Sequence, residues 1–254
     1  MNVIILAAGK GSRMKDLTKN KPKCFLKING VTLIERLINQ LKKLKVKDIS
    51  IVTGYRANKF FFKDVNFFFN KEYRTTNMIY SLMKAKRKLN KDTLIIYSDI
   101  LISNEMLKKM LNIKKNFAVA VDVDWRKYWK FRFNKILNDL ESLKINNYGH
   151  IKEIGKDTLN LKNIDARYIG IIKTSKKINK MITTIWKKEK NKKKSNWEIS
   201  GNSLNKSYMT DLINHLVNSK KINCHAIKFK GGWYEFDNKK DFFKFKDSKY
   251  RKIQ

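Results

Sequence analysis

The sequence predicts an α/β domain with a mostly parallel sheet, and three observations support this prediction. The chain has 254 residues, which is the length of one large α/β domain. Short apolar runs alternate with helical patterns through its first half, as they do in βαβ units. A hydrophobic fraction of 42%, with 15 Phe and 5 Trp, supplies the material for a core.

The first elements alternate between strand and helix. Residues 2–6 form an apolar run that predicts a buried strand, and the small and basic residues 7–20 predict a loop. A short strand is expected at 23–28. Thr32 and Glu35 have the spacing of a capping box. The helix that follows carries apolar residues at helical spacing, namely Leu33, Leu37, Leu41 and Leu44.

The same alternation continues to the middle of the chain and then changes. Further strands of the first half are expected at 48–52, 65–69, 93–97 and 117–121, and helices at 77–89 and 104–111. In the second half, strands of an antiparallel or mixed edge are expected at 143–145, 151–154 and 168–172. Helices near 175–189 and 207–218, a strand at 224–229 and a C-terminal helix complete the chain. No repeat or flexible linker divides it, so a single domain over 1–254 is expected.

Cysteine usage and hydropathy indicate a cytoplasmic protein. Cys24 and Cys224 are the two cysteines, and neither belongs to a CxxC motif, so two reduced thiols are expected. The N-terminal residues do not form a signal peptide. No stretch reaches the ~18 apolar residues of a membrane helix. We therefore expect a cytoplasmic location without membrane insertion.

The formal net charge of +36 has two interpretations. A basic stripe would indicate a nucleic-acid-binding protein. The lysines, however, are spread over most of the chain, which fits a lysine-rich proteome. The exception is the run at 186–194, which is more typical of a solvated helix end. We predict no nucleic-acid partner, while the positive field would attract polyphosphate substrates.

The loop after the first strand is the most informative motif. Small residues allow a backbone to approach a ligand closely, and successive amides form an anion nest. Arg13 adds a fork of donors for a phosphate. The loop is neither a P-loop nor a dinucleotide fingerprint, which has a third glycine where Met14 stands; an ordinary glycine loop is the alternative. The candidate nucleotide-binding residues here are Leu6, Ala7, Ala8, Gly9, Gly11 and Ser12.

A second basic segment contains Pro22, the only proline of the chain. Proline fixes its own φ and restricts the residue before it. The ring therefore stiffens the stretch that presents Lys21 and Lys23. A rigid lysine beside a phosphate nest suits a polyphosphate ligand.

Together, the LAAGKGSRM and NKPK segments resemble the signature of the nucleotidyltransferase superfamily that activates sugar phosphates and small alcohol phosphates. Gly54 and Tyr55 match the "GY" turn of that family. Asn77 and Ser81 lie in a segment similar to the NxxxSL helix of its cytidylyltransferase branch, and these four residues join the candidate nucleotide-binding set. Residues 232–237 are similar to its late W-x-E-[IF]-D element. The branch resembled most is that of bacterial phosphocholine cytidylyltransferases and CTP:phosphoglutamine cytidylyltransferases.

This resemblance implies a Rossmann-like, three-layer α/β/α fold, with a nucleotide-binding half at 1–122 and an acceptor-binding half at 123–254. It implies transfer of CMP from CTP to a small phosphomonoester of the phosphoglutamine or phosphocholine type, with release of pyrophosphate, for decoration of a surface or capsule polysaccharide. Arg13 and Lys23 are the expected catalytic residues. The alternative is a hexose-1-phosphate nucleotidyltransferase that uses UTP or dTTP. A homodimer is considered, but the sequence does not decide the oligomeric state.

Two aspartates are the candidate metal ligands. Asp99 is expected at the carboxyl end of a strand, where α/β sheets place their ligands, and Asp237 ends a later segment. Mg²⁺ binds a few carboxylates together with phosphate oxygens and water. A helix cap is the alternative role for each aspartate. The resemblance favours Mg²⁺ ligands.

An aromatic and basic segment at 122–132 is the candidate acceptor site. An aromatic cage would suit a quaternary ammonium, whereas arginines would suit a carboxylate. Arg126 and Arg132 favour an amino-acid-like acceptor such as phosphoglutamine, and Trp129 and Tyr168 complete the candidate set. An amphipathic surface helix with buried aromatics is the alternative.

Overall fold

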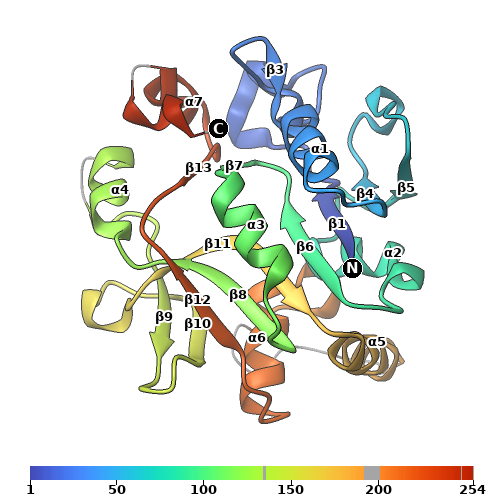
Figure 1. Cartoon of the computed structure of the whole chain (residues 1–254), viewed down its shortest axis with the longest axis vertical. Helices are drawn as coiled ribbons and strands as arrows, with labels where there is room; N and C mark the ends of the chain where they lie inside the picture. The colour runs from blue at the N-terminus through green and yellow to red at the C-terminus, as the bar shows by residue number, and fades with distance from the viewer. Residues whose placement is uncertain (134–135, 192–200, 247, 254) are drawn as a thin grey trace.

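The structure is a computed structural model, which describes residues 1–133, 136–191, 201–246 and 248–253. A seven-stranded sheet forms its centre (Figure 1). In spatial order, its strands are β12 (His225–Phe229), β8 (Phe117–Asp122), β11 (Arg167–Thr174), β6 (Thr93–Tyr97), β1 (Asn2–Ala7), β4 (Ile49–Thr53) and β5 (Val65–Phe69). All pairs are parallel except those that β11 makes with β6 and β8.

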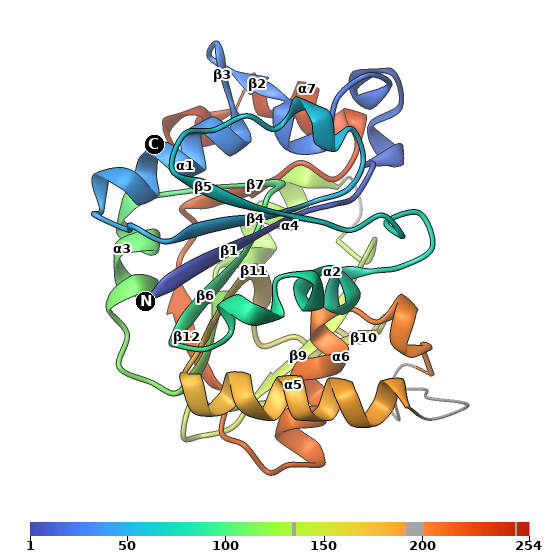
Figure 2. The ribbon, with the colours of Figure 1, turned by 90° about the vertical axis from the view of Figure 1, so that its right-hand side faces the viewer.

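Helices cover both faces of this sheet (Figure 2). Side chains of β1 alternate between two apolar clusters, because successive residues of a strand point to opposite faces. Val3 and Ile5 pack in one cluster with α1 (Leu33–Lys43) and α3 (Asn104–Asn112). Ile4 packs in the other with α2 (Met78–Lys84), α5 (Lys176–Lys190) and α6 (Met209–Asn218). The expected three-layer α/β/α fold is confirmed.

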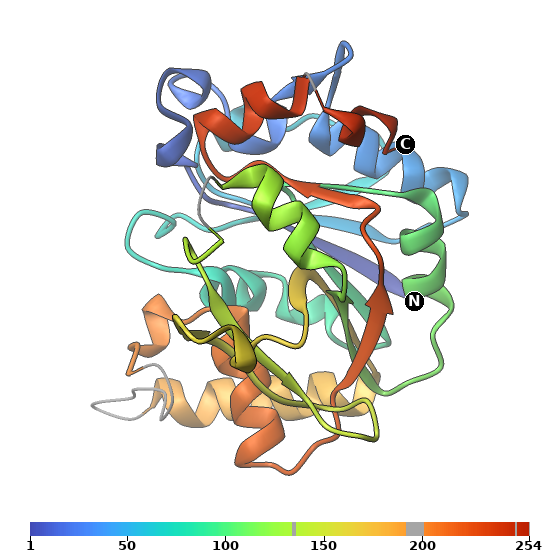
Figure 3. The ribbon, with the colours of Figure 1, turned by 90° about the vertical axis from the view of Figure 1, so that its left-hand side faces the viewer.

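Smaller elements complete the described chain. The short strands β7 (Ile100–Ile102) and β13 (Trp233–Glu235) pair with each other. The hairpin of β9 (Glu141–Ile145) and β10 (Ile151–Asp157) lies beside α6 (Figure 3). The helices α4 (Trp125–Arg132) and α7 (Lys239–Lys246) pack on the face that α1 covers. The remaining paired strands are β2 (Lys27–Ile28) and β3 (Val31–Thr32).

Local sequence signals account for several element ends. The Thr32 hydroxyl accepts a hydrogen bond from the Glu35 amide, and the Glu35 carboxylate accepts one from the Thr32 amide. The predicted capping box at the start of α1 is therefore confirmed. Ser175 caps α5 in a similar way, with its hydroxyl accepting from the Ile178 amide. The part of the lysine run at 192–194 lies outside the described residues.

The structure corrects three expectations about elements. The strand expected at 168–172 is not at an edge: it is the centre of β11, and every residue of β11 except Tyr168 is buried. Such an uninterrupted buried run is typical of a strand covered on both faces. Pro22 begins a 3-10 turn at Lys23–Phe25, so only the end of the strand expected at 23–28 forms. The helix expected at 77–89 ends at Lys84 and continues as a 3-10 turn at Lys86–Lys88.

Candidate active site

The glycine-bearing loop leaves the carboxyl end of β1 and packs against the turn that follows β4. The Tyr55 amide donates a hydrogen bond to the Ala8 carbonyl at 2.9 Å. A Cβ at Gly54 would lie 2.5 Å from the same carbonyl oxygen. Only glycine fits there without moving one of the two backbones. Gly54 and Tyr55 therefore support the loop, and neither belongs to the lining of the two pockets described below.

Lys23 lies directly over this loop. Gly11 has a φ of 67°, and a Cβ on it would lie 2.8 Å from Cβ of Lys23. Glycine at this position allows both the left-handed backbone and the close approach of the lysine. The loop and the Pro22 segment, which the sequence analysis treated as two motifs, thus form one unit.

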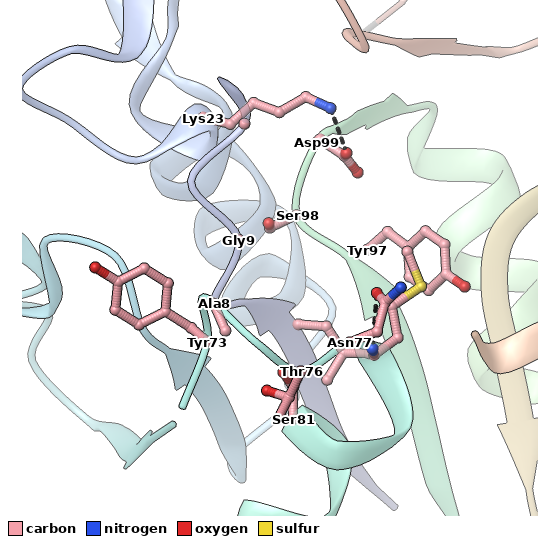
Figure 4. Close-up of a pocket in the computed structure, with 13 residues that line it drawn as sticks. Ala8, Gly9, Lys23, Tyr73, Thr76, Asn77, Ser81, Tyr97, Ser98 and Asp99 are labelled. Atoms are coloured by element: carbon pink, nitrogen blue, oxygen red, sulfur yellow. Dashed lines mark hydrogen bonds and ion pairs between the residues drawn. The ribbon is translucent and has the colours of Figure 1, made fainter. Parts of the chain in front are cut away.

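A first pocket of about 200 Å³ opens beside the loop, as Figure 4 shows. It lies at the carboxyl ends of β1 and β6, as expected for a parallel sheet. Of the predicted nucleotide-binding residues, Leu6, Ala8, Gly9, Gly11, Asn77 and Ser81 line it. Ala7 points into the core and Ser12 is exposed on the outer side of the loop. Lys23 and Asp99, which the sequence predicts in other roles, also line it. The sequence assigned no role to the remaining residues of the lining, which are Tyr73, Thr76, Met78, Tyr97 and Ser98.

The polar groups of Asn77 and Ser81 already have protein partners. Asn77 caps α2, and its side-chain oxygen accepts a hydrogen bond from the Met78 amide at 3.0 Å. Its side-chain nitrogen donates to the Lys206 carbonyl at 3.3 Å. Ser81 accepts from the side chain of Asn70 at 3.0 Å. These bonds hold the floor of the first pocket in place.

Lys23, Asp99 and Asp237 meet at the mouth of the first pocket. Nζ of Lys23 lies 2.7 Å from Oδ2 of Asp99 and 3.3 Å from Oδ1 of Asp237. Arg13 reaches Asp237 at 2.6 Å. The pairing of β7 with β13 brings the two aspartates together, because the Phe236 amide donates to the Asp99 carbonyl.

The charges of this cluster influence one another. Burial alone would lower the pKa of the Lys23 ammonium, but Asp99 and Asp237 raise that pKa above its usual value. Burial and the neighbouring Glu235 carboxylate raise the pKa of Asp237. Lys23 therefore remains a cation, and Asp237 requires cations around it.

The two aspartates fit a divalent cation. Both carboxylates contact the same ammonium, so one cation placed between them reaches both. Mg²⁺ is commonly held by one or two carboxylates, with substrate phosphates and water as the remaining ligands. Within the part of the chain that the structure describes, no group of three or more His, Cys, Asp or Glu side chains forms a metal cage. Asp99 and Asp237 could therefore supply two of the ligands of such a cation.

A second pocket of about 280 Å³ adjoins the first, and Met78 and Tyr97 line both. Trp129 and Tyr168, two of the predicted acceptor residues, line it, and so do Arg13 and Asp237. The rest of the lining is Asp139, Glu141, Arg167, Ile169, Gly170, Tyr208, Thr210, Trp233 and Glu235. Most of these residues lie in segments that resemble the cytidylyltransferase branch, but the sequence did not assign a role to any of them singly.

The two arginines predicted to bind the acceptor lie elsewhere. Arg126 is exposed, and its guanidinium lies 4.8 Å from the Trp125 ring, outside both pocket linings. Arg132 is completely buried and is bidentate to Asp241, at 3.0 and 2.9 Å. It also contacts Glu235 at 2.6 Å. Arg132 therefore holds the segment that carries Asp237.

The comparisons with known proteins agree with this geometry. Residues 3–154 match the family of MobA-like NTP transferase domains. The chain is 33% identical over 250 residues to a CTP:phosphoglutamine cytidylyltransferase of Campylobacter jejuni, which is 93% of this chain and 96% of that protein. It is 36% identical over 123 residues to a choline-phosphate cytidylyltransferase of Haemophilus influenzae, which is 47% of this chain and 52% of that protein.

Solved structures share the fold. A CTP:phosphocholine cytidylyltransferase from Streptococcus pneumoniae superposes with a TM-score of 0.64 at 21% identity, over 97% of each chain. A putative glucose-1-phosphate thymidylyltransferase from Bacillus anthracis gives a TM-score of 0.70 at 21% identity, over 100% of this chain and 96% of that one. In the described part of the chain, every helix is too short or too polar to span a membrane. By its sequence and fold, the chain belongs to the MobA-like NTP transferase family and is a nucleotidyltransferase of the cytidylyltransferase group.

Proposed function

We propose that the chain transfers CMP from CTP to a small phosphorylated acceptor of the phosphoglutamine or phosphocholine type and releases pyrophosphate. The observation that carries this proposal is the position of Lys23. Its ammonium contacts Asp99, which lines the first pocket, and Asp237, which lines the second. A cationic junction between two pockets is where a nucleotide and an acceptor phosphate would meet.

The first pocket receives the nucleotide in this proposal. The backbone of the loop from Ala8 to Gly11 approaches the phosphates, since no side chain at Gly9 or Gly11 intervenes. The base lies towards Thr76 and Asn77, on the α2 side of the pocket. The preference for cytosine rests on the similarity to cytidylyltransferases.

Arg13 and Lys23 neutralise charge during the transfer. Lys23 is held at the junction, so it stabilises the negative charge that develops on the α-phosphate. Arg13 is 68% exposed in its side chain and lies at the rim, where it contacts the leaving pyrophosphate. Asp99 and Asp237 would hold Mg²⁺, which would supply electrophilic assistance at the phosphates.

The acceptor needs no general base. A phosphate group with a second pKa near ~6 is largely dianionic at neutral pH, so its oxygen attacks without losing a proton to the protein. Neither pocket includes a histidine among its described lining residues. His150 and His225 instead pack against each other, with ring centroids 4.5 Å apart. Catalysis therefore rests on in-line positioning and charge neutralisation.

The cellular setting is part of the same proposal. We place the reaction in the cytoplasm, and the CMP-activated product would serve the decoration of a surface polysaccharide. The location rests on the cysteine usage and hydropathy of the sequence, and the role in polysaccharide decoration rests on the family resemblance of the sequence motifs.

A pyrophosphate-release assay tests this function. Four NTPs with Mg²⁺ are crossed with phosphoglutamine, phosphocholine, glycerol phosphates and hexose 1-phosphates. Release with CTP and one of the first two acceptors, but not with Lys23→Ala, supports the proposal. Lys59→Ala, at an exposed lysine outside both pockets, is the matched control. Release only with UTP or dTTP and a hexose 1-phosphate would replace the proposal with the hexose alternative.

A further inference from the structure

Apart from the exposed Asp139, the charged residues that line the second pocket fall into two groups. Asp237 and Glu235 are neutralised by the protein itself, through ion pairs with Arg13, Lys23 and Arg132. The other group lies across the pocket, at the starts of β9 and β11. It consists of a carboxylate on Glu141 and a guanidinium on Arg167.

Arg167 is a buried cation without a carboxylate partner. It is 9% exposed, and its guanidinium lies 4.1 Å from the Trp129 ring centroid. Nη1 donates to the Glu141 backbone carbonyl at 3.2 Å, but Nε is buried and has no hydrogen-bond partner. Among the described residues, no Asp or Glu forms an ion pair with it. Burial lowers the pKa of this arginine, although the nearby carboxylates of Glu141, Glu235 and Asp139 act in the opposite direction.

Glu141 is the negatively charged member of this group. Its carboxylate faces the same pocket and forms no ion pair in the described part of the chain. Burial raises the pKa of Glu141, although Arg167 acts in the opposite direction. A partly exposed carboxylate and a buried guanidinium therefore border one cavity, and neither forms an ion pair among the described residues.

We propose that Arg167 and Glu141 determine acceptor specificity by binding the carboxylate and the ammonium of a zwitterionic, amino-acid-type acceptor. This assignment rests on the proposed function and narrows its acceptor to one class. The acceptor phosphate then extends from these two residues towards Asp237, which lines the same pocket and contacts Lys23.

The geometry opposes a quaternary ammonium acceptor. One face of Trp129 is already covered by the Arg167 guanidinium, so that face is not free to bind a second cation. An acceptor without a carboxylate would also leave Arg167 buried and unpaired. A site built for a polar group discriminates strongly against an analogue that lacks it.

Two series of acceptors test the assignment on the wild-type chain. The first contains phosphoglutamine, its analogue without the carboxylate (phosphorylated 4-aminobutanamide) and its analogue without the amine (phosphorylated glutaramate). The second contains O-phosphoserine, phosphoethanolamine and 3-phosphoglycerate, with phosphocholine added. In the series that contains the better substrate, removal of either the carboxylate or the amine from the acceptor should raise the KM about ten- to hundred-fold. This is the effect expected for loss of a hydrogen bond to a charged group. Equal use of phosphocholine or of a carboxylate-free analogue would overturn the assignment.

Two variants assign each charge to a residue. Arg167→Gln should remove the preference for the carboxylate and keep the preference for the amine, while Glu141→Gln should do the reverse. Arg87→Gln, at an exposed arginine over the Phe68 ring, is the matched control, and circular dichroism confirms folding. An equal penalty on all three compounds of a series in Arg167→Gln would reject its role in specificity.

Calorimetric binding of the same compounds separates this inference from the proposed function. Selective binding of the zwitterion without any CTP-dependent pyrophosphate release would reject the proposed reaction and leave the specificity pair in place. CTP-dependent pyrophosphate release at the same rate from acceptors with and without an amine or a carboxylate would support the proposed reaction and reject the specificity pair.

Discussion

Nζ of Lys23 lies 2.7 Å from Oδ2 of Asp99, so a lysine from the N-terminal loop meets a carboxylate 76 residues later in the chain. Lys23 packs closely against Gly11. Asp99 is positioned by the pairing of β7 with β13. Neither side chain is positioned by its own segment alone. The contact therefore forms only when both segments at the carboxyl ends of the central strands are in place.

Removing this ammonium should impair chemistry more than binding. We expect Lys23→Ala to lower kcat about a hundred-fold or more, which is typical for loss of a fixed donor at a developing charge. Steady-state kinetics with saturating CTP and acceptor measure the effect, with Lys59→Ala as the control. Turnover within a few-fold of the wild type would rule out a catalytic role for Lys23.

The two aspartates should govern the metal requirement. Chelation with EDTA should abolish turnover and added Mg²⁺ should restore it. Asp99→Asn and Asp237→Asn each remove a charged ligand, so both variants should need more Mg²⁺ for half-maximal rate. Asp64→Asn, which affects only an exposed pair with Lys42 at 3.5 Å, provides the control titration. A Mg²⁺ dependence that is the same in all four proteins would contradict the metal assignment.

The turn at Gly54 packs against the glycine-bearing loop and should not tolerate a side chain. A Cβ in Gly54→Ala would lie 2.5 Å from the Ala8 carbonyl oxygen and 2.7 Å from Cβ of Tyr73. We expect the loop to shift, at a cost of about 1–3 kcal/mol for overpacking, and the KM for CTP to rise about ten-fold. Kinetics at fixed acceptor give this value. An unchanged KM for CTP would show that the loop does not depend on this contact.

Arg132 should contribute to stability. In Arg132→Met, Asp241 and Glu235 lose their buried partner, and such a loss typically costs about 3–5 kcal/mol. Urea unfolding monitored by circular dichroism measures the change in the free energy of unfolding. Arg126→Met removes an exposed arginine, so its effect should stay within about 1 kcal/mol. Similar losses in the two variants would contradict the assignment.

The two thiols should be unreactive in the folded chain. Burial raises the pKa of Cys24, where Asp99 adds to the effect, and it also raises the pKa of Cys224. The thiolate is the reactive form, so a disulfide reagent at neutral pH should label neither cysteine until denaturant is added. Absorbance after reagent addition gives the number of exposed thiols. Rapid labelling of the native chain would show that the cysteines are accessible.

The nucleotide side of the site could be predicted from the sequence because its residues lie in contiguous motifs. The loop and the Pro22 segment are close in the chain, and the late Asp237 has its own motif. The acceptor side could be predicted only in part. Glu141 and Arg167 lie in segments that resemble the phosphoglutamine branch, but they are single charged residues at strand starts, and only the tertiary structure places them in one pocket.

The error on Arg132 has a physical cause. An arginine among aromatic residues suits a ligand carboxylate, and the sequence shows no sign that Asp241 will lie beside it. The centre of the sheet was missed for a related reason. Periodicity indicates that residues 168–172 are a strand, but not that β11 pairs with both β6 and β8.

The antiparallel direction of β11 affects which parts of the strands line the candidate site. Because β11 is antiparallel to its neighbours, its first residues, from Arg167 to Gly170, lie at the edge where the parallel strands end. In the proposed function, the nucleotide therefore lies against strand ends and the acceptor largely against strand starts. Substitutions at those starts would then change the acceptor without altering the residues proposed to hold the nucleotide.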